Sequence, residues 1–330
     1  VFGNPGDQFG RSVSLSGDTL VVGAPTEDSN ATGVNGDQNS NTSRQTGAAF
    51  VFVRNGTTWT QQAYLKPSNT SQANPNFNYL YFGWRVAVDG DTIVVGAPVE
   101  DSISAGGNGS QTYDVVENFA GTTNVGAVYV VTRNGTTWGQ QSYIKPSNPT
   151  MNDNFGSAID LSGDTLVVGV ENESSNASGT NGNQNDESAP FSGAVYVFQR
   201  NGSGWSQQAY LKASNAGNND RFGHAVSIDG DDLLVTAPWE NSDATGVGGD
   251  ETNNTVGRAG AAYLFSRSGS TWSQQAYIKP SNTGFGDEFG VTAHLNGDRI
   301  AIGATGESSA ATGIDGDQED DSAAAAGAVY

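Results

Sequence analysis

The sequence contains no cysteine, which excludes disulfide bonds and thiolate metal sites. Lysine is scarce too, and its only occurrences fall at one repeated position: Lys66, Lys145, Lys212 and Lys279. No apolar run approaches the length that a membrane-spanning segment needs, so we expect no membrane insertion. No signal peptide is recognisable, and a chain that starts at Val1 suggests a mature or trimmed protein.

Positive charge as a whole is scarce. Lysine and arginine together number 14 against 35 acidic residues, which makes the formal net charge −21 and the isoelectric point about 4.1. Such a surface repels nucleic acid and anionic membranes and favours cations, so we expect no nucleic-acid partner.

What the sequence does contain is a repeat. A motif that begins with Phe-Gly recurs at Phe9, Phe82, Phe155, Phe222 and Phe289, in steps of 73, 73, 67 and 67 residues. A period of this size is typical of one stacked array or ring rather than of two ordinary domains. We therefore expect a single domain over residues 1–330. Its units should lie at approximately 9–69, 82–148, 155–215, 222–282 and 289–330.

Each repeat predicts four strands, which the first copy places at residues 11–15, 20–25, 48–53 and 59–65. The first alternates apolar residues with serine, as a half-buried strand does. The second is a continuous apolar run, which suits a strand covered on both faces. The third is rich in aromatic and β-branched residues, and Asn55-Gly56 predicts a tight hairpin before the fourth.

Five such repeats predict an all-β fold, a β-propeller of about five four-stranded blades. A β-sandwich is the alternative, but it does not explain a period carried through every strand. The chain stops at Tyr330, before a fifth copy of the W…QQAYLKPSN segment, so the last blade should lack its outermost strand. A closed ring of five blades is the first expectation, and an open arc or part of a seven-blade ring is the second.

The chain resembles the FG-GAP repeat family, known from integrin α-subunit propellers and from many bacterial secreted or surface proteins. The Phe-Gly pairs, Val-Val-Gly-Ala-Pro at 21–25 and Gly-Ala-Val-Tyr-Val-Phe at 193–198 carry the resemblance, which covers essentially the whole chain. It implies that the Phe-Gly strand lines a central channel and that the tryptophan-containing strand is outermost. It also implies an extracellular or cell-surface location.

Calcium-binding repeats of the integrin type carry a DxDxDG loop between the first two strands. That connection is only a Ser-Gly-Asp turn here, so those sites cannot be transferred. Oxygen side chains at i, i+2 and i+4 occur instead between the second and third strands, a spacing that matches calcium loops. The candidate Ca²⁺ ligands are Asn35, Asp37, Asn39, Asn181, Asn183, Asn185, Asp315, Asp317 and Glu319. The alternative is a solvated acidic loop without an ion.

Other acidic residues are expected near these loops. A carboxylate precedes each candidate loop, at Glu27, Glu171 and Glu307. In an antiparallel blade the 2–3 and 4–1 connections share one face, so the aspartates before each Phe-Gly pair should lie there too. These are Asp7, Asp153, Asp220 and Asp287.

The acceptor pattern for N-glycosylation is abundant. It occurs at Asn30, Asn41, Asn55, Asn69, Asn108, Asn134, Asn172, Asn176, Asn201 and Asn253. An extracellular chain could carry sugars at several of these sites. The alternative is that a sequence rich in Asn, Ser and Thr produces such triplets by chance.

No catalytic constellation appears, and we expect no enzymatic activity. The histidines, His224 and His294, occupy different offsets within their repeats, and no nucleophile elbow, phosphate loop or HExxH motif occurs. One tryptophan recurs in each complete repeat and should pack between blades: Trp59, Trp138, Trp205 and Trp272. Trp239 does not recur, and it either stacks on a sugar or fills a local gap.

Two functions follow from these features. The first is an extracellular structural and adhesive protein, which forms head-to-tail filaments when another copy completes the open fifth blade. The second is a monomeric adhesion module that binds glycans or surface proteins through its loops. Differences between the loops of the repeats favour the binding module. The loop at 102–125 is enlarged, and aromatic residues cluster at Phe77, Tyr79 and Tyr81. A longer parent chain that supplies the missing strand itself is the simpler alternative to assembly.

Overall fold

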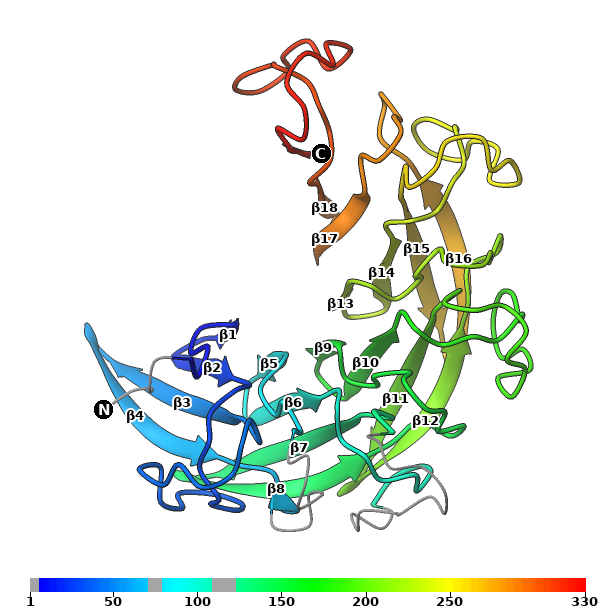
Figure 1. Ribbon diagram of the computed structural model, residues 1–330. Coiled ribbons are helices and arrows are strands. Elements are labelled where there is room, and N and C mark those ends of the chain that lie inside the picture. The colour runs from blue at the N-terminus through cyan, green and yellow to red at the C-terminus, as the bar shows by residue number, and fades with distance from the viewer. Residues whose placement is uncertain (1–5, 71–78, 109–122) are drawn as a thin grey trace. The chain divides into compact units, whose positions relative to one another are not determined.

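The computed structural model describes residues 6–70, 79–108 and 123–330, and strands β1 to β19 carry its fold (Figure 1). They form four sheets of four strands and one sheet of three, in which hydrogen-bonded neighbours are antiparallel. The prediction of an all-β propeller with a short last blade is therefore confirmed.

Within each sheet the strands follow sequence order. The first sheet contains β1 (Ser12–Ser16), β2 (Thr19–Ala24), β3 (Ala48–Asn55) and β4 (Thr58–Leu65). The second contains β5 (Val86–Asp89), β6 (Thr92–Ala97), β7 (Ala127–Asn134) and β8 (Thr137–Ile144). The third contains β9 (Ala158–Ser162), β10 (Thr165–Val170), β11 (Ala194–Asn201) and β12 (Gly204–Leu211). The fourth contains β13 (Val226–Asp229), β14 (Asp232–Ala237), β15 (Ala261–Ser268) and β16 (Thr271–Ile278). The fifth contains β17 (Phe289–Asn296), β18 (Arg299–Ala304) and β19 (Ala328–Val329).

The contacts of the chain group into two compact units. One comprises residues 1–168 and 198–207, and the other comprises residues 169–197 and 208–330. Inside the first unit, β5 packs against β1 and β2. Inside the second, β17 packs against β13 and β14.

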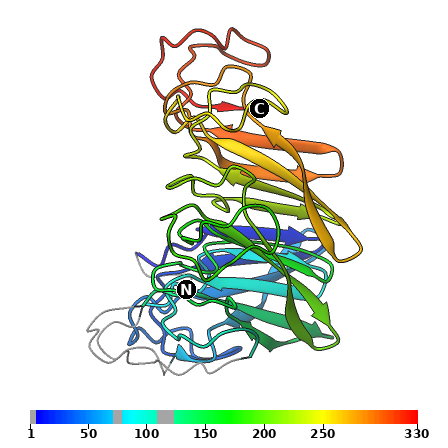
Figure 2. The same cartoon turned by 90° about the vertical axis from the view of Figure 1, so that its right-hand side faces the viewer.

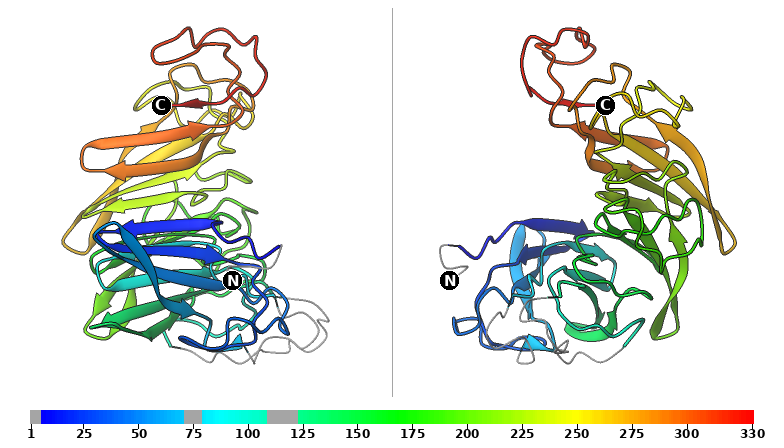
Figure 3. Two further views of the ribbon diagram at one scale, coloured as in Figure 1. Left: turned by 90° about the vertical axis from the view of Figure 1, so that its left-hand side faces the viewer. Right: turned by 45° about the vertical axis from the view of Figure 1, so that its right-hand side comes forward.

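The hairpins and the long connections lie at opposite ends of the strands. In Figure 2 the hairpin between β15 and β16 (gold) is at one end of its sheet, and the 2–3 loop is at the other. The first sheet (blue) has the same arrangement in the left-hand view of Figure 3. Backbone bonds such as Trp239 N–H to Asp220 O, 3.3 Å, tie a 2–3 loop to a 4–1 connection. The expectation that both kinds of connection share one face is thus confirmed.

The recurring residues make the contacts between consecutive sheets. Gly83, of the second Phe-Gly pair, has φ 92°, and a Cβ there would lie 2.2 Å from Ala48 O. A Cβ on Gly96, of the second Gly-Ala-Pro triplet, would lie 2.1 Å from Gly156 O. The motif therefore needs glycine twice, for a left-handed backbone and for close approach of two main chains.

Serine and tryptophan complete these contacts. Ser12 Oγ accepts a hydrogen bond from Val86 N–H, 2.9 Å, which joins the first strands of two consecutive sheets. The indole N–H of Trp138 donates to Gln62 Oε1 on the fourth strand of the preceding sheet, 2.7 Å. Trp205 and Trp272 repeat this contact. Packing between blades is thus confirmed for three tryptophans, whereas Trp59 of the first sheet is 39% exposed.

Candidate functional site

A buried lysine–glutamate pair recurs in each of the four complete sheets. The pairs are Lys66–Glu27, Lys145–Glu100, Lys212–Glu173 and Lys279–Glu240. In each, Nζ lies 2.8–2.9 Å from Oε2, and the lysine side chain is wholly inaccessible to solvent. These pairs use every lysine in the sequence.

The strands and loops place the two partners. The glutamate opens the long connection after the second strand, and the lysine directly follows the fourth strand. The main chain holds the lysine there, because its N–H donates to a glycine carbonyl of the same connection, as from Lys66 N–H to Gly33 O at 2.8 Å. Each pair therefore fastens the long loop to the end of the outer strand.

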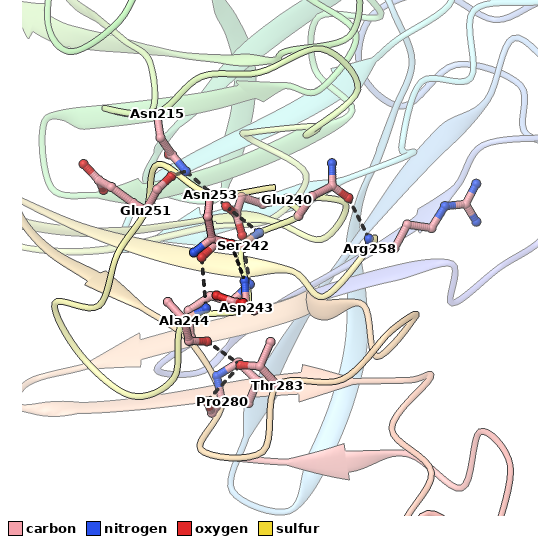
Figure 4. Close-up of polar contacts among 12 residues, drawn as sticks. Asn215, Glu240, Ser242, Asp243, Ala244, Glu251, Asn253, Arg258, Pro280 and Thr283 are labelled. Carbon is pink, nitrogen blue, oxygen red and sulfur yellow. Dashed lines mark hydrogen bonds and ion pairs between the residues drawn. The ribbon is translucent and has the colours of Figure 1, made fainter. Parts of the chain in front are cut away.

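In the fourth repeat the glutamate also joins its own repeat to the preceding one. Glu240 Oε1 accepts hydrogen bonds from Asn215 Nδ2 and from Ser242 N–H, each 3.1 Å long (Figure 4). The other carboxylate oxygen, Oε2, accepts a hydrogen bond from Lys279 Nζ at 2.8 Å. Asn215 belongs to the preceding repeat, and its Oδ1 accepts the hydroxyl of Tyr263 at 2.7 Å. Both carboxylate oxygens are thus satisfied by groups from two consecutive repeats.

The same network holds the second sheet. Asn69 Nδ2 donates to Glu100 Oε1, 3.0 Å, and Asn69 Oδ1 accepts the hydroxyl of Tyr129, 2.6 Å. Glu100 is the first-unit counterpart of Glu240. Asn69 was a glycosylation candidate from its sequence, and the structure places its amide in this buried network.

Burial lowers the pKa of Lys66 and of Lys279, although the charge of the facing glutamate opposes this change. A buried pair of this kind contributes little over an apolar replacement of the same shape, but losing one partner is costly because the other charge stays buried. The pairs therefore serve to lock the loops in place.

The fifth sheet has the glutamate without the lysine. Glu307 is 2% exposed, and its Oε1 accepts hydrogen bonds from Asn282 Nδ2 and Ser309 N–H, each 3.1 Å. Ser309 Oγ lies 3.3 Å from Oε2, and the hydroxyl of Tyr330 donates to Asn282 Oδ1. Residues 1–330 offer Glu307 no lysine, since all four are paired elsewhere.

A second acid lies near Glu307. Asp287, 6% exposed, accepts a hydrogen bond from Gly284 N–H at 2.7 Å. Burial raises the pKa of Asp287, and the negative charge of Glu307 raises it further. This end of the fifth sheet thus concentrates negative charge beneath its loop.

Two of the calcium candidates, Asn35 and Asn181, contact the fourth strand of their sheets. Asn35 and Asn181, the first members of their triplets, accept main-chain N–H groups from Tyr64 and Tyr210 at 3.0 and 2.9 Å. Both adopt positive φ, 58° and 57°. The first candidate oxygen of these loops is therefore an anchor for the fourth strand.

The second members form short turns. Asp37, Asn183 and Asp317 each accept the N–H two residues later, at 2.9, 3.2 and 3.1 Å. In the last loop Asp315, Asp317 and Glu319 are exposed. Their oxygens are the ligand type that Ca²⁺ prefers, and calcium binding stays a prediction.

Most glycosylation candidates are accessible. Exposed side chains occur at Asn30, Asn41, Asn55, Asn108, Asn134, Asn176 and Asn201, and half-buried ones at Asn172 and Asn253. Asn69 is only 4% exposed. The exposed and half-buried asparagines are therefore accessible to sugars, whereas Asn69 is not accessible while this repeat is folded.

A cluster that does not repeat lies in the second unit. Glu171 Oε2 lies 2.7 Å from His224 Nδ1 and 3.3 Å from Arg221. Burial alone would raise the pKa of Glu171, but its bond to His224 and the charges of His224 and Arg221 lower it below its usual value. Arg221 and Arg258 stack on the Trp239 ring, 3.9 and 4.1 Å from its centroid.

Sequence reasoning missed three features here. The glutamate that matches Glu27 in the third repeat is Glu173, whereas Glu171 belongs to the cluster around His224. The two arginines that stack on Trp239 were not anticipated either. The other histidine, His294, lies in β17. Of the enlarged second loop, residues 109–122 lie outside the described residues, as does Phe77.

In residues 6–70, 79–108 and 123–330, no helix has the length and apolarity that a membrane crossing requires. Residues 3–52, 59–131, 138–198 and 205–265 match the family described as FG-GAP repeat. No curated protein matches the chain. The match covers most of the chain and confirms the family resemblance seen in its motifs.

Proposed function

Because this chain belongs to the FG-GAP repeat family, we propose that it is a non-enzymatic structural and adhesive protein, secreted or displayed at the cell surface. The observation that carries the proposal is the contrast between a constant frame and variable loops. Four buried lysine–glutamate pairs hold the same end of four sheets. The loops at that end differ in length and in surface chemistry.

The loop differences favour binding. The 2–3 connection spans residues 98–126 in the second repeat but 25–47 in the first. Tyr81 stacks on Trp84, with ring centroids 5.9 Å apart, and Arg11 lies 4.3 Å above the same indole. Trp239 carries two arginines in the other unit. Aromatic and arginine side chains are the types enriched where proteins meet partners, so a glycan or surface protein is the proposed target.

The carboxylates that form ion pairs and hydrogen bonds within the protein support the non-enzymatic part of the proposal. Glu100 and Glu240 are buried, and their carboxylate oxygens accept hydrogen bonds from lysine, asparagine and serine. Glu171 is neutralised by Arg221 next to His224. These groups therefore stabilise the fold.

A glycan array and a cell-surface binding assay test the adhesive role. Trp239→Ala and Trp84→Ala alter the loop face, whereas Arg54→Ala alters the exposed hairpin at the other end of the first sheet. We expect the tryptophan substitutions to reduce binding and the control to leave it unchanged. Equal binding by all three variants, or none by the parent protein, would contradict the proposal.

Assembly through the fifth sheet is the second proposed function. β19 pairs with β18 over only two residues, and Val329 is 78% exposed. An exposed strand edge is a template for another chain, and head-to-tail contacts of this kind build filaments. Light scattering and negative-stain images over a range of concentrations would show filaments. A monodisperse monomer at high concentration would rule them out.

Calcium in the 2–3 loops and sugars on the exposed asparagines complete the proposal. Both fit an acidic protein outside the cell. Mass spectrometry of the natural protein would locate sugars, and modified Asn69 in folded protein would contradict its buried placement.

A further inference from the structure

Two residues near each of the second to fifth Phe-Gly pairs have a left-handed main chain, although neither is glycine. One directly precedes the phenylalanine, and the other comes two residues before the glycine that precedes the third strand. The N–H of the first donates to the carbonyl oxygen of the second, as from Arg221 to Phe191 at 3.0 Å. The pairs, with φ between 46° and 61°, are Gln45–Tyr81, Asn124–Asn154, Phe191–Arg221 and Arg258–Glu288. One main-chain arrangement therefore presents different side chains in different repeats.

The second unit places bulky side chains at these positions. Asparagine tolerates a left-handed main chain, as at Asn124, whereas the same conformation is strained for larger residues. Phe191, Arg221 and Arg258 nevertheless adopt it, with φ of 54°, 61° and 54°. Strained residues of this kind cluster at ligand-binding sites, where the placement of the side chain matters. These three side chains are therefore the first to consider for contact with a ligand.

Trp239 connects the two arginines. The guanidinium carbons of Arg221 and Arg258 lie 3.9 and 4.1 Å from the centroid of its ring. Arg221 also lies 5.7 Å from the ring centroid of Phe191. Attraction between a guanidinium group and an aromatic ring stabilises one orientation of a flexible side chain. We call Phe191, Arg221, Trp239 and Arg258 the arginine row.

The two arginines differ in their other partners. Arg221, 24% exposed, lies 3.3 Å from Glu171, which also binds His224 at 2.7 Å. Arg258 is 54% exposed, and its ion pair with Glu288 spans 3.8 Å, which is too long for a hydrogen bond. Figure 4 shows the side chain of Arg258 extending away from the hydrogen-bonded loop. Within the described residues, Arg258 thus has guanidinium N–H groups available for an incoming acceptor.

The chemistry of the row fits a carboxylate on a sugar. The planar fork of a guanidinium group matches a carboxylate with two parallel hydrogen bonds. Phe191 is 41% exposed and offers an apolar ring, and the exposed amide of Asn219 lies beside it, because Asn219 N–H donates to Pro190 O at 2.9 Å. Small-ligand sites combine aromatic side chains with a few placed polar groups in this way.

Charge and size narrow the ligand further. A protein with a net charge of −21 repels a polyanion, so a ligand with one carboxylate is favoured over a highly charged polymer. Protein interfaces of the usual size take about 20–30 residues on each side. The arginine row and its neighbours are far fewer, which suits a short glycan better than a protein partner.

We propose that the arginine row binds a glycan that ends in a single acidic sugar. The carboxylate of that sugar accepts hydrogen bonds from Arg258, and the following sugars lie toward Phe191 and Asn219. Trp239 is a positioning residue that holds both arginines. This inference deepens the proposed adhesive function and rests on it.

Paired glycans test the proposal without changing the protein. The probes are oligosaccharides that end in sialic acid or glucuronic acid, and the control for each is its methyl ester, which lacks the charge. We expect at least one acid to bind at least about tenfold more tightly than its ester, because charge-assisted hydrogen bonds are lost. Equal affinity for acid and ester would overturn this inference but leave the adhesive function standing. So would attachment to cells without binding of any glycan, whereas the absence of both would overturn the two proposals together.

Protein variants then locate the site. Arg258→Met should reduce the preference for acid over ester to less than about threefold, and Arg258→Lys, which keeps the charge without the fork, should be intermediate. Trp239→Ala should lower the same preference, which a purely structural role would leave unchanged. Arg54→Met is the matched control, because Arg54 also lies over a tryptophan ring, at 5.6 Å, beside an exposed aspartate.

Two results with these variants would contradict the assignment. A full preference for the acid in Arg258→Met would place the carboxylate elsewhere, and an equal loss in Arg54→Met would show a non-specific effect of removing positive charge. Circular dichroism checks that each variant is folded. Binding of acidic peptides in place of acidic glycans, if it depends on Arg258, would assign the row to a protein partner and overturn the proposal.

Discussion

Replacing Lys145 by methionine removes one partner of a buried ion pair and leaves the other in place. Lys145 Nζ lies 2.8 Å from Glu100 Oε2, and the two side chains are 0% and 2% exposed. Methionine fills a similar volume, so the main effect is an uncompensated carboxylate. Breaking a buried pair in this way costs about 3–5 kcal/mol of unfolding free energy.

The fifth sheet supplies the matched comparison. Glu100→Gln should destabilise the protein by a similar amount, because Lys145 would then be the unpaired charge. Glu307→Gln removes a buried carboxylate that faces no lysine, so we expect no loss of stability from it, or a gain. The same substitution should thus destabilise the protein at Glu100 but not at the equivalent Glu307.

Urea unfolding followed by tryptophan fluorescence measures both effects, with circular dichroism as a check on the fold. Arg54→Met is the control, because its partner Asp18 is exposed and surface pairs contribute only about 0–1 kcal/mol. A loss below about 1 kcal/mol for Lys145→Met would refute the reasoning. So would equal destabilisation by Glu100→Gln and Glu307→Gln.

Three further predictions concern acid, packing and metal. Burial raises the pKa of Asp220 to about 7, above the value of about 3.9 expected when unfolded, so the folded protein keeps a proton that the unfolded chain releases between about pH 4 and 7. The free energy of unfolding should therefore fall as pH rises through this window. Asp220→Asn should reduce that fall by at most about 4 kcal/mol above pH 7. Thermal unfolding of both proteins at pH 4 and pH 8 measures this, and an equal pH dependence in the two would contradict it. Gly96→Ala should lower the free energy of unfolding by about 1–3 kcal/mol, because the new Cβ would lie 2.1 Å from Gly156 O. Gly139→Ala is the control: open space surrounds its new Cβ, so it should be nearly neutral in the same urea assay. If Ca²⁺ holds loops such as residues 315–319, a chelator should lower the melting temperature, and an unchanged midpoint would remove that idea.

Local patterns were enough to predict the strands and their order. Alternation, continuous apolar runs and Asn-Gly turns are read over a few residues, and each repeat supplies them again. The predicted strand at 48–53 appears as β3 and the one at 59–65 as β4, extended by only one or two residues. The Phe-Gly and Gly-Ala-Pro motifs likewise identified the family, because their glycines are needed for main-chain contacts that every repeat makes.

The same patterns did not show what each loop oxygen contacts. Oxygen side chains at alternate positions resemble a calcium loop, yet Asn35 and Asn181 direct an oxygen to the backbone of the fourth strand. The available signal was asparagine next to glycine, which is typical of a left-handed backbone. Spacing alone could not show which group each oxygen would meet.

By itself, the sequence determined an all-β repeat protein with four complete units and a short fifth, since these properties depend on neighbouring residues. The tertiary structure decided what the four lysines do. Lys66 and Glu27 are 39 residues apart and meet only because the second and fourth strands end on the same side of one sheet. It likewise decided that Glu307 is buried with the same asparagine and serine partners and no lysine. Burial and partnership depend on how distant strands pack, and no local pattern encodes that.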